Sequence, residues 1–210
     1  MVEQLFYFII YPGLLFAGIA GGLIAWADRK VTARVQFRKG PPILQPFYDF
    51  LKLLLVKETI VPRHASAIMF LIAPVLALFG ATAAAVIILS PALGIENGFR
   101  GDIIVLFYLL AIPSLMFVIG ALASGNPLSA VGASREIKLV LSYELTFLLV
   151  IAGIILKSDL SLSLNEIMMI QWTDGAFIGS VSGVLLFIAA LFCIQAKMGM
   201  VPFDQGEAET

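Results

Sequence analysis

Five long apolar segments, almost free of charged residues, limit what this chain can fold into. They cover residues about 5–26, 67–90, 104–124, 138–156 and 176–196. Apolar stretches of about 18 residues or more are typical of membrane-spanning helices, because lipid offers no hydrogen bonds and a helix satisfies its own backbone. With 60% hydrophobic and 13% charged residues, the 210-residue chain is too apolar for a soluble domain. The sequence predicts an all-α integral membrane protein with about five transmembrane helices in a single membrane domain, 1–210.

Basic residues concentrate in the loop 27–66, between the first two predicted helices. Of the thirteen Lys and Arg residues, eight lie in this loop. Its densest part carries Asp28, Arg29, Lys30, Arg34, Arg38 and Lys39. Positively charged loops mark the cytoplasmic side of membrane proteins. We therefore expect the loop and the C-terminus in the cytoplasm, with the N-terminus outside the cell membrane.

The second half of this loop has the pattern of a surface helix. Gly40-Pro41-Pro42 ends any preceding helix, and apolar residues then recur at helical spacing. The pattern comprises Leu44, Phe47, Leu51, Leu54 and Leu55, interspersed with Asp49, Lys52, Lys57 and Glu58. It predicts a cytoplasmic amphipathic helix on the membrane surface or under a partner. A solvated connector is the alternative, although it would expose the apolar face to water.

Two further segments between the predicted helices contain few charges. Residues 124–134 have none and are rich in small and turn-forming residues, which predicts a break at membrane depth. Residues 158–175 are expected to form an outer loop with an apolar patch around 167–170 and Trp172 at the interface.

Glu144 is the most informative single residue, since a carboxylate about two turns inside an apolar helix is costly and indicates a functional site. Lys138 is six residues away, which is awkward for a direct pair within one helix. A partner from another segment is therefore expected. One hypothesis is a proton relay; the alternative is a buried carboxylate that pairs with an arginine to fix packing.

The last predicted helix is followed by Lys197 and then by three acids, Asp204, Glu207 and Glu209. Such a run is often a solvated tail. Because it lies on the same predicted membrane side as the basic residues 29–39, it could also form an ion-pair network that faces a partner or a cavity.

Soluble-type enzyme chemistry is not encoded in the chain. No metal-ligand spacing, phosphate-binding loop or nucleophile triad is present, and the single cysteine, Cys193, cannot build a zinc or iron–sulfur site alone. Net charge is −1, which argues against nucleic-acid binding. We expect no catalytic residue, metal or cofactor in this chain, so any redox cofactor belongs to partners.

Three motifs in order resemble a known family. The first runs from Asp28-Arg-Lys-Val through Gln36-Phe-Arg-Lys-Gly-Pro41 and Gln45-Pro-Phe-Tyr-Asp49 to Lys57-Glu58; the second is Gly132-Ala-Ser-Arg-Glu136 with Ser142-Tyr-Glu144; the third is Pro202-Phe-Asp204 with Glu207 and Glu209. They resemble the H subunit of respiratory complex I, the counterpart of mitochondrial NADH dehydrogenase subunit 1. The resemblance covers nearly the whole chain.

Two departures from that family narrow the resemblance. Gly40-Pro41-Pro42 leads to Gln45 without the Asn and the extra residues of complex I. This shorter form is similar to the equivalent membrane subunit of energy-converting membrane-bound [NiFe] hydrogenases and their sulfur-reducing relatives. Family members also continue through about three more helices, which implies that 1–210 corresponds to the N-terminal part of an eight-helix subunit.

The resemblance implies a non-catalytic subunit of an oxidoreductase complex. It would anchor the electron-transfer arm in the membrane and couple electron transfer from ferredoxin to protons or sulfur with pumping of H⁺ or Na⁺. The implied docking or cavity residues are Asp28, Arg29, Lys30, Arg34, Arg38, Lys39, Asp49, Glu58, Arg135 and Glu136. The implied coupling residues are Glu144, Lys197, Asp204, Glu207 and Glu209.

The partners that this resemblance implies are homologues of the peripheral iron–sulfur and large subunits, antiporter-like membrane subunits and membrane lipid. Iron–sulfur clusters, and a NiFe centre in the hydrogenase case, would lie in those partners. A quinone-site subunit of respiratory complex I is one alternative, and it adds quinone as a ligand. A stand-alone secondary ion transporter that uses Glu144 is the other.

Overall fold

The computed structural model describes residues 2–58, 60–94, 101–200 and 203, and it is helical with no strand in those ranges. The chain divides into two compact units, residues 1–60 and 61–210. Each unit is described below by itself.

The first unit consists of helices α1 (Val2–Ile9), α2 (Leu14–Val35) and α3 (Gln45–Leu55). The apolar segment 5–26 was expected as one helix, but it is interrupted between α1 and α2, where Pro12 has no N–H to donate. Helix α2 also continues nine residues past the predicted end at 26. Charged side chains do not break a helix, and the first strong breakers are Gly40 and the prolines after it.

Helices α2 and α3 form a hairpin with specific contacts. The indole Nε1 of Trp26 donates a hydrogen bond to the Pro41 carbonyl at 3.1 Å. The Phe47 ring lies over Gly22, where a Cβ would come within 2.8 Å of the ring. Helix α3 is the predicted amphipathic helix, and many of its apolar side chains are exposed in this chain, Leu54 by 64% and Leu55 by 76%.

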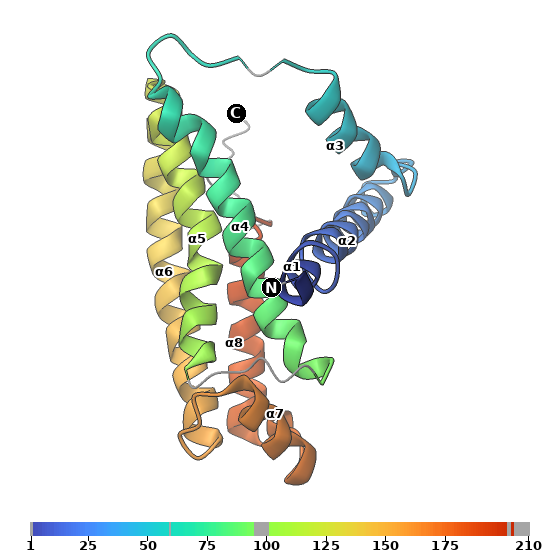
Figure 1. Ribbon diagram of the computed structural model, residues 1–210, viewed down its shortest axis with the longest axis vertical. Helices are drawn as coiled ribbons and strands as arrows, with labels where there is room; N and C mark the ends of the chain where they lie inside the picture. Colours follow the sequence, from blue (N-terminus) through green and yellow to red (C-terminus); the bar gives the residue numbers. More distant parts are fainter. Residues whose placement is uncertain (1, 59, 95–100, 201–202, 204–210) are drawn as a thin grey trace. The chain divides into compact units, whose positions relative to one another are not determined.

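The second unit is a bundle of long helices (Figure 1). Its elements are α4 (Ala67–Ala92), α5 (Asp102–Ala123), α6 (Pro127–Lys157), α7 (Leu164–Thr173), the short 3₁₀ helix η1 (Phe177–Gly179) and α8 (Val181–Lys197). Helix α5 packs against α4 and α6, and α6 also packs against α8. Four candidate spans are long and apolar enough to cross a membrane within the described residues: Phe6–Val35 and helices α4, α5 and α6; α8 is a shorter apolar helix.

Helix α6 begins eleven residues before the predicted start at 138. The expected break over 124–134 is confined to the short turn before Pro127. The Asn126 side chain caps α6 by accepting a hydrogen bond from the Leu128 N–H, and Pro127 occupies the first helical turn, where it is tolerated. The small residues that follow are compatible with a helix, so their lack of charge did not indicate a break.

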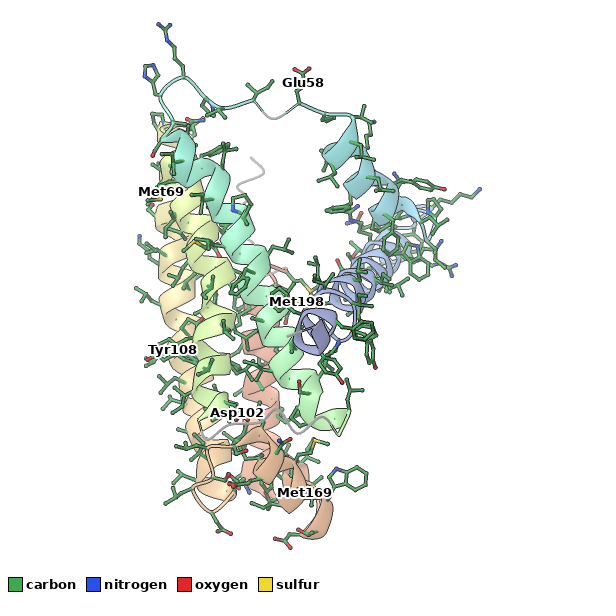
Figure 2. The ribbon with its side chains drawn as sticks, viewed as in Figure 1. Glu58, Met69, Asp102, Tyr108, Met169 and Met198 are labelled. Carbon is green, nitrogen blue, oxygen red and sulfur yellow. The ribbon has the colours of Figure 1, made fainter. Side chains whose placement is uncertain are left out.

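The expected outer loop 158–175 contains helix α7, which is fastened to the start of α5. Asp102 is buried, and its Oδ1 accepts a hydrogen bond from the Leu164 N–H at 2.7 Å. The Gly101 N–H also donates to the Leu162 carbonyl. Figure 2 shows Asp102 at the end of the bundle where Met169 of α7 lies. Asp102 therefore supplies the N-terminal cap of α7, because Ser163 makes no side-chain cap bond there.

Replacing Asp102 by Ala should lower the free energy of unfolding by about 1–2 kcal/mol, since the first turn of α7 loses its acceptor. Thermal melting of the helical circular dichroism signal in detergent measures this. Asp102→Asn is the matched control, because it retains one acceptor oxygen and should recover most of the stability. Equal melting of all three proteins would reject the capping role.

Candidate functional site

Glu144 of α6 forms an ion pair with Lys197, the last residue of α8. The lysine Nζ donates to Glu144 Oε1, and the two side chains are only 14% and 11% exposed. The partner thus comes from another segment, as the sequence predicted. Helices α6 and α8 pack against each other, which brings together residues 53 positions apart.

Aromatic rings of α6 surround the lysine end of the pair. Lys197 Nζ lies 5.1 Å from the centre of the Tyr143 ring and 5.0 Å from that of Phe147. Ring faces attract a cation, so both contacts help to hold the ammonium group at this position. The ammonium group of Lys197 therefore contacts the Glu144 carboxylate and the two aromatic rings.

The second oxygen of Glu144 is not used in this arrangement. Among the described residues, Oε2 is buried and has no hydrogen-bond partner. A buried acceptor without a partner costs free energy unless it gains a proton or a donor. Oε2 is thus the atom of the pair whose capacity to accept a hydrogen bond is unused.

A small cavity lies next to the pair, between α6 and α8. Its volume is about 170 Å³. The lining residues are Leu139, Ser142, Tyr143, Thr146, Phe192, Cys193, Ala196 and Phe203. Tyr143 and Ala196 are the sequence neighbours of the ion pair, and they form a small buried core with Val140. The lining combines apolar side chains with hydroxyl groups, which can accept a few water molecules.

The pair lies deep along α6. Thirteen residues separate Glu144 from Lys157 at the end of α6, which corresponds to about 20 Å of helix. A hydrocarbon core is about 30 Å thick. If Lys157 marks one membrane surface, Glu144 lies about 10 Å below the other, which agrees with the depth inferred from sequence.

The charged residues of the first unit that the sequence singled out are mostly exposed. The exposed members are Asp28, Arg29, Arg34, Arg38, Lys39 and Glu58, whereas Lys30 and Asp49 are partly buried. Arg29 and Asp49 form a loose ion pair with a distance of 3.6 Å between Nη1 and Oδ2. Lys30 Nζ lies 5.8 Å from the Trp26 ring centre. The remaining charges are available to a partner surface.

Phe37 is a residue of this surface that sequence reasoning missed. Its side chain is 100% exposed, and its backbone has φ of +57°. The Phe37 N–H closes the end of α2 on the Arg34 carbonyl, a position that Gly usually fills. A left-handed, fully exposed aromatic between Gln36 and Arg38 is costly for the chain alone, which indicates a use outside it.

Other predicted residues lie away from the ion pair or outside the described residues. Arg135 is exposed and Glu136 partly buried near the start of α6. The acids Asp204, Glu207 and Glu209 lie outside the described residues, so their network with the basic residues 29–39 stays a prediction. In the described ranges, no group of three or more His, Cys, Asp and Glu side chains is placed to hold a metal ion.

Comparison with known proteins identifies the family of this chain. The NADH dehydrogenase family model matches residues 8–210. The chain belongs to the NADH dehydrogenase family. The H subunit of NADH-quinone oxidoreductase from Thermomicrobium roseum is 36% identical over 94% of this chain and 65% of that protein. NADH-ubiquinone oxidoreductase chain 1 of Chondrus crispus is 36% identical over 91% of this chain and 59% of the relative.

A solved structure of the same architecture comes from an archaeal respiratory membrane complex, the membrane-bound sulfane sulfur reductase. The matched chain has a TM-score of 0.82 and 30% sequence identity, over 93% of this chain and 63% of that one. The present chain therefore spans about 60% of the length of the proteins it matches. This member of the NADH dehydrogenase family is a membrane protein homologous to the H subunit, and such homologues are subunits of multisubunit oxidoreductase complexes.

Proposed function

We propose that this chain is the coupling subunit of a ferredoxin-linked membrane oxidoreductase, which docks the iron–sulfur arm and links its electron transfer to movement of H⁺ or Na⁺. The buried ion pair between Glu144 and Lys197 carries this proposal. Its depth in the bundle, its unused carboxylate oxygen and the cavity beside it are the features that an ion-coupling site requires.

The mechanism needs two states of this pair. In one state, Lys197 neutralises Glu144; in the other, a proton on Oε2 does so and the lysine is released. A negative charge that forms on a partner during electron transfer would attract the lysine and favour the second state. The change in charge would then bias the antiporter-like subunits, which is an electrostatic switch without a catalytic residue in this chain.

Glu144→Gln should keep the fold and the assembled complex but lower ion movement per electron by about tenfold or more, because a relay that loses its titratable group typically slows by at least that factor. Inverted membrane vesicles allow both quantities to be measured together, with a pH-sensitive dye for H⁺, radioactive Na⁺ for sodium, and electron transfer by the rate of product formation.

Glu166→Gln is the matched control, because Glu166 lies on α7 and bonds the Ser161 hydroxyl at the other end of the bundle. It should pump normally. If the Glu144→Gln complex moves as many ions per electron as this control, the pair is a packing feature and the coupling role is wrong.

The charge pattern supports a cytoplasmic position for the loop 27–66 and for the C-terminus. In this orientation the Lys157 end of the bundle faces outward. Accessibility of single introduced cysteines to a membrane-impermeant reagent, at position 39 and at position 159, tests it. We expect labelling at position 159 from outside intact cells, and labelling at position 39 only after the membrane is opened.

The exposed basic residues of the first unit are proposed to hold the peripheral arm. Arg34→Ala combined with Arg38→Ala should lower the amount of arm that co-purifies by about tenfold, because two charge contacts at a rim are lost. Phe37→Gly should also weaken docking, although it relieves backbone strain of about 1 kcal/mol in the free chain. Lys57→Ala, an exposed basic residue beyond α3, is the control. Stoichiometric recovery of the arm with the Arg34/Arg38 variant would reject this surface.

The choice of partner follows from two observations. The whole 210-residue chain aligns with the H subunit of NADH-quinone oxidoreductase from Agrobacterium fabrum over 239 positions, so that quinone-type relative carries residues that this chain lacks. The short Gly40-Pro41-Pro42 connection agrees with this difference from the quinone-type relative. The structural likeness to a sulfur reductase chain also favours a partner other than a quinone-reducing arm. These features support a hydrogenase or sulfur-reducing partner over the quinone-reducing alternative, and relatives named as subunits disfavour a stand-alone transporter.

Nickel and iron in the complex purified through this chain would identify that partner. About one nickel per complex indicates a NiFe hydrogenase arm, and ferredoxin-driven hydrogen evolution should then be found. Iron without nickel, together with polysulfide reduction, indicates the sulfur-reducing type. Iron without nickel, with quinone reduction that depends on residues of the loop 27–66, would support the complex I alternative.

A further inference from the structure

A second cleft lies at the opposite end of the bundle from Lys197, between α6, α7, η1 and α8. Its volume is about 190 Å³. It is lined along one face of each long helix. Val150, Ile154 and Lys157 of α6 are spaced by four and three residues, and Gly183, Leu186, Phe187 and Ala190 of α8 are spaced by three, one and three. Seven residues of helix are about 10 Å long, so the cleft is elongated along the helices.

The two ends of this cleft differ in chemistry. Its polar side chains are Lys157, at the end of α6 where the candidate span stops, and Gln171 of α7. Toward the centre of the bundle the lining is apolar, from Ile154 and Phe187 to Val150 and Ala190. A polar entrance at interface depth that leads into an apolar slot about 10 Å deep has the dimensions of a lipid head group with the upper part of an acyl chain.

Lys157 is held in place, and no carboxylate of the described part of the chain neutralises it. Its Nζ donates to the Ser180 Oγ at 2.6 Å. Ser180 Oγ in turn donates to the Phe177 carbonyl and accepts from the Gly183 N–H, so the hydroxyl is fixed. Among the described residues, no acid lies within ion-pair distance of this ammonium group. A partly buried, positioned cation without a counter-charge is complementary to an anionic phosphate.

We propose that this cleft binds a phospholipid with an anionic head group, whose phosphate contacts Lys157 and Gln171 and whose acyl chain lies along Ile154, Leu186 and Phe187. The site is independent of the coupling role proposed for Glu144. The lipid would fill the space between α6 and α8 at the end where α7 crosses them, and it would hold η1 against α6.

Lipid binding can be measured on the full chain in detergent by native mass spectrometry during titration with dioleoyl phosphatidylglycerol. Lys157→Gln should weaken binding about fivefold, the effect of one basic residue near an anionic lipid surface. Lys157→Arg should bind as the unchanged chain does. Ala190→Trp, which fills the apolar end, should also reduce binding although the charge is retained. Lys138→Gln is the matched control, since Lys138 is an exposed lysine of the same helix.

Two comparisons decide whether the ligand is a lipid. Dioleoyl phosphatidylcholine should bind more weakly than phosphatidylglycerol, and soluble glycerol phosphate at the same concentration should not compete. Competition by glycerol phosphate would indicate that the cleft binds a free phosphate ester and not a lipid, and it would overturn the proposal. Equal binding by Lys157→Gln and Lys138→Gln would also overturn the proposal. So would the absence of phosphatidylglycerol binding to the unchanged chain, since protein would then cover the cleft. Unchanged helical circular dichroism of each variant shows that loss of binding is not loss of fold.

Discussion

Lys197→Met is expected to lower the free energy of unfolding by about 3 kcal/mol, because it leaves the buried Glu144 carboxylate without a counter-charge. The side chain of Met has a similar length to that of Lys and can still pack against Tyr143 and Phe147, so the loss measures mainly the missing charge. Chemical or thermal unfolding of the purified chain in detergent, followed by helical circular dichroism, provides the measurement.

The double variant Glu144→Gln with Lys197→Met separates charge from shape. It removes both charges, and we expect it to recover most of the stability that Lys197→Met loses. It should nevertheless fail to couple ion movement to electron transfer, since neither group can change its charge. If the double variant is as unstable as the single one, or if it pumps normally, the pair is not the charge switch described above.

Gly80→Val should have the second large effect, because it separates the two most closely packed helices. Gly80 of α4 is buried against α5, and a Cβ there would lie 2.8 Å from the Ile112 Cβ and 3.2 Å from the Leu109 carbonyl oxygen. Neither atom belongs to the flexible end of a side chain, so the helices must move apart. We expect a loss of about 2–3 kcal/mol or failure to accumulate in the membrane.

The same substitution at Gly18 is the control for Gly80. Gly18 lies within α2, and no atom lies within 4 Å of the position of its Cβ. Gly18→Val should therefore change the unfolding midpoint of the isolated chain by little. If the Gly80→Val protein has the same unfolding midpoint as the Gly18→Val protein, the close approach of α4 and α5 does not limit stability.

The sequence predicted the elements of this fold better than their ends. Long apolar runs identify the helices because lipid imposes the helix on the backbone. The ends depend on local caps: Asn126 and Pro127 allowed α6 to begin in a segment that resembled a break, and Pro12 interrupted the first helix. Helix α7 was missed because its cap, Asp102, comes from a residue 62 positions away.

The candidate site was predictable only in part for the same reason. Glu144 could be recognised from its cost in an apolar helix, and a partner on another segment could be inferred. That Lys197 is this partner depends on the packing of α6 on α8, which no local pattern encodes. Phe37 was part of the first motif but was not singled out, because its backbone angle and its exposure cannot be read from the sequence. The cleft at Lys157 likewise requires four elements to converge.

Helices α6 and α8 are joined by polar contacts at two levels, Glu144 with Lys197 and Lys157 with Ser180. These contacts are about 20 Å apart along α6. If the first contact opens while the second holds, α8 pivots like a lever about its Ser180 end, and the largest displacement occurs at its Lys197 end. A change of charge at one carboxylate would thereby become a movement of the Lys197 end of the helix.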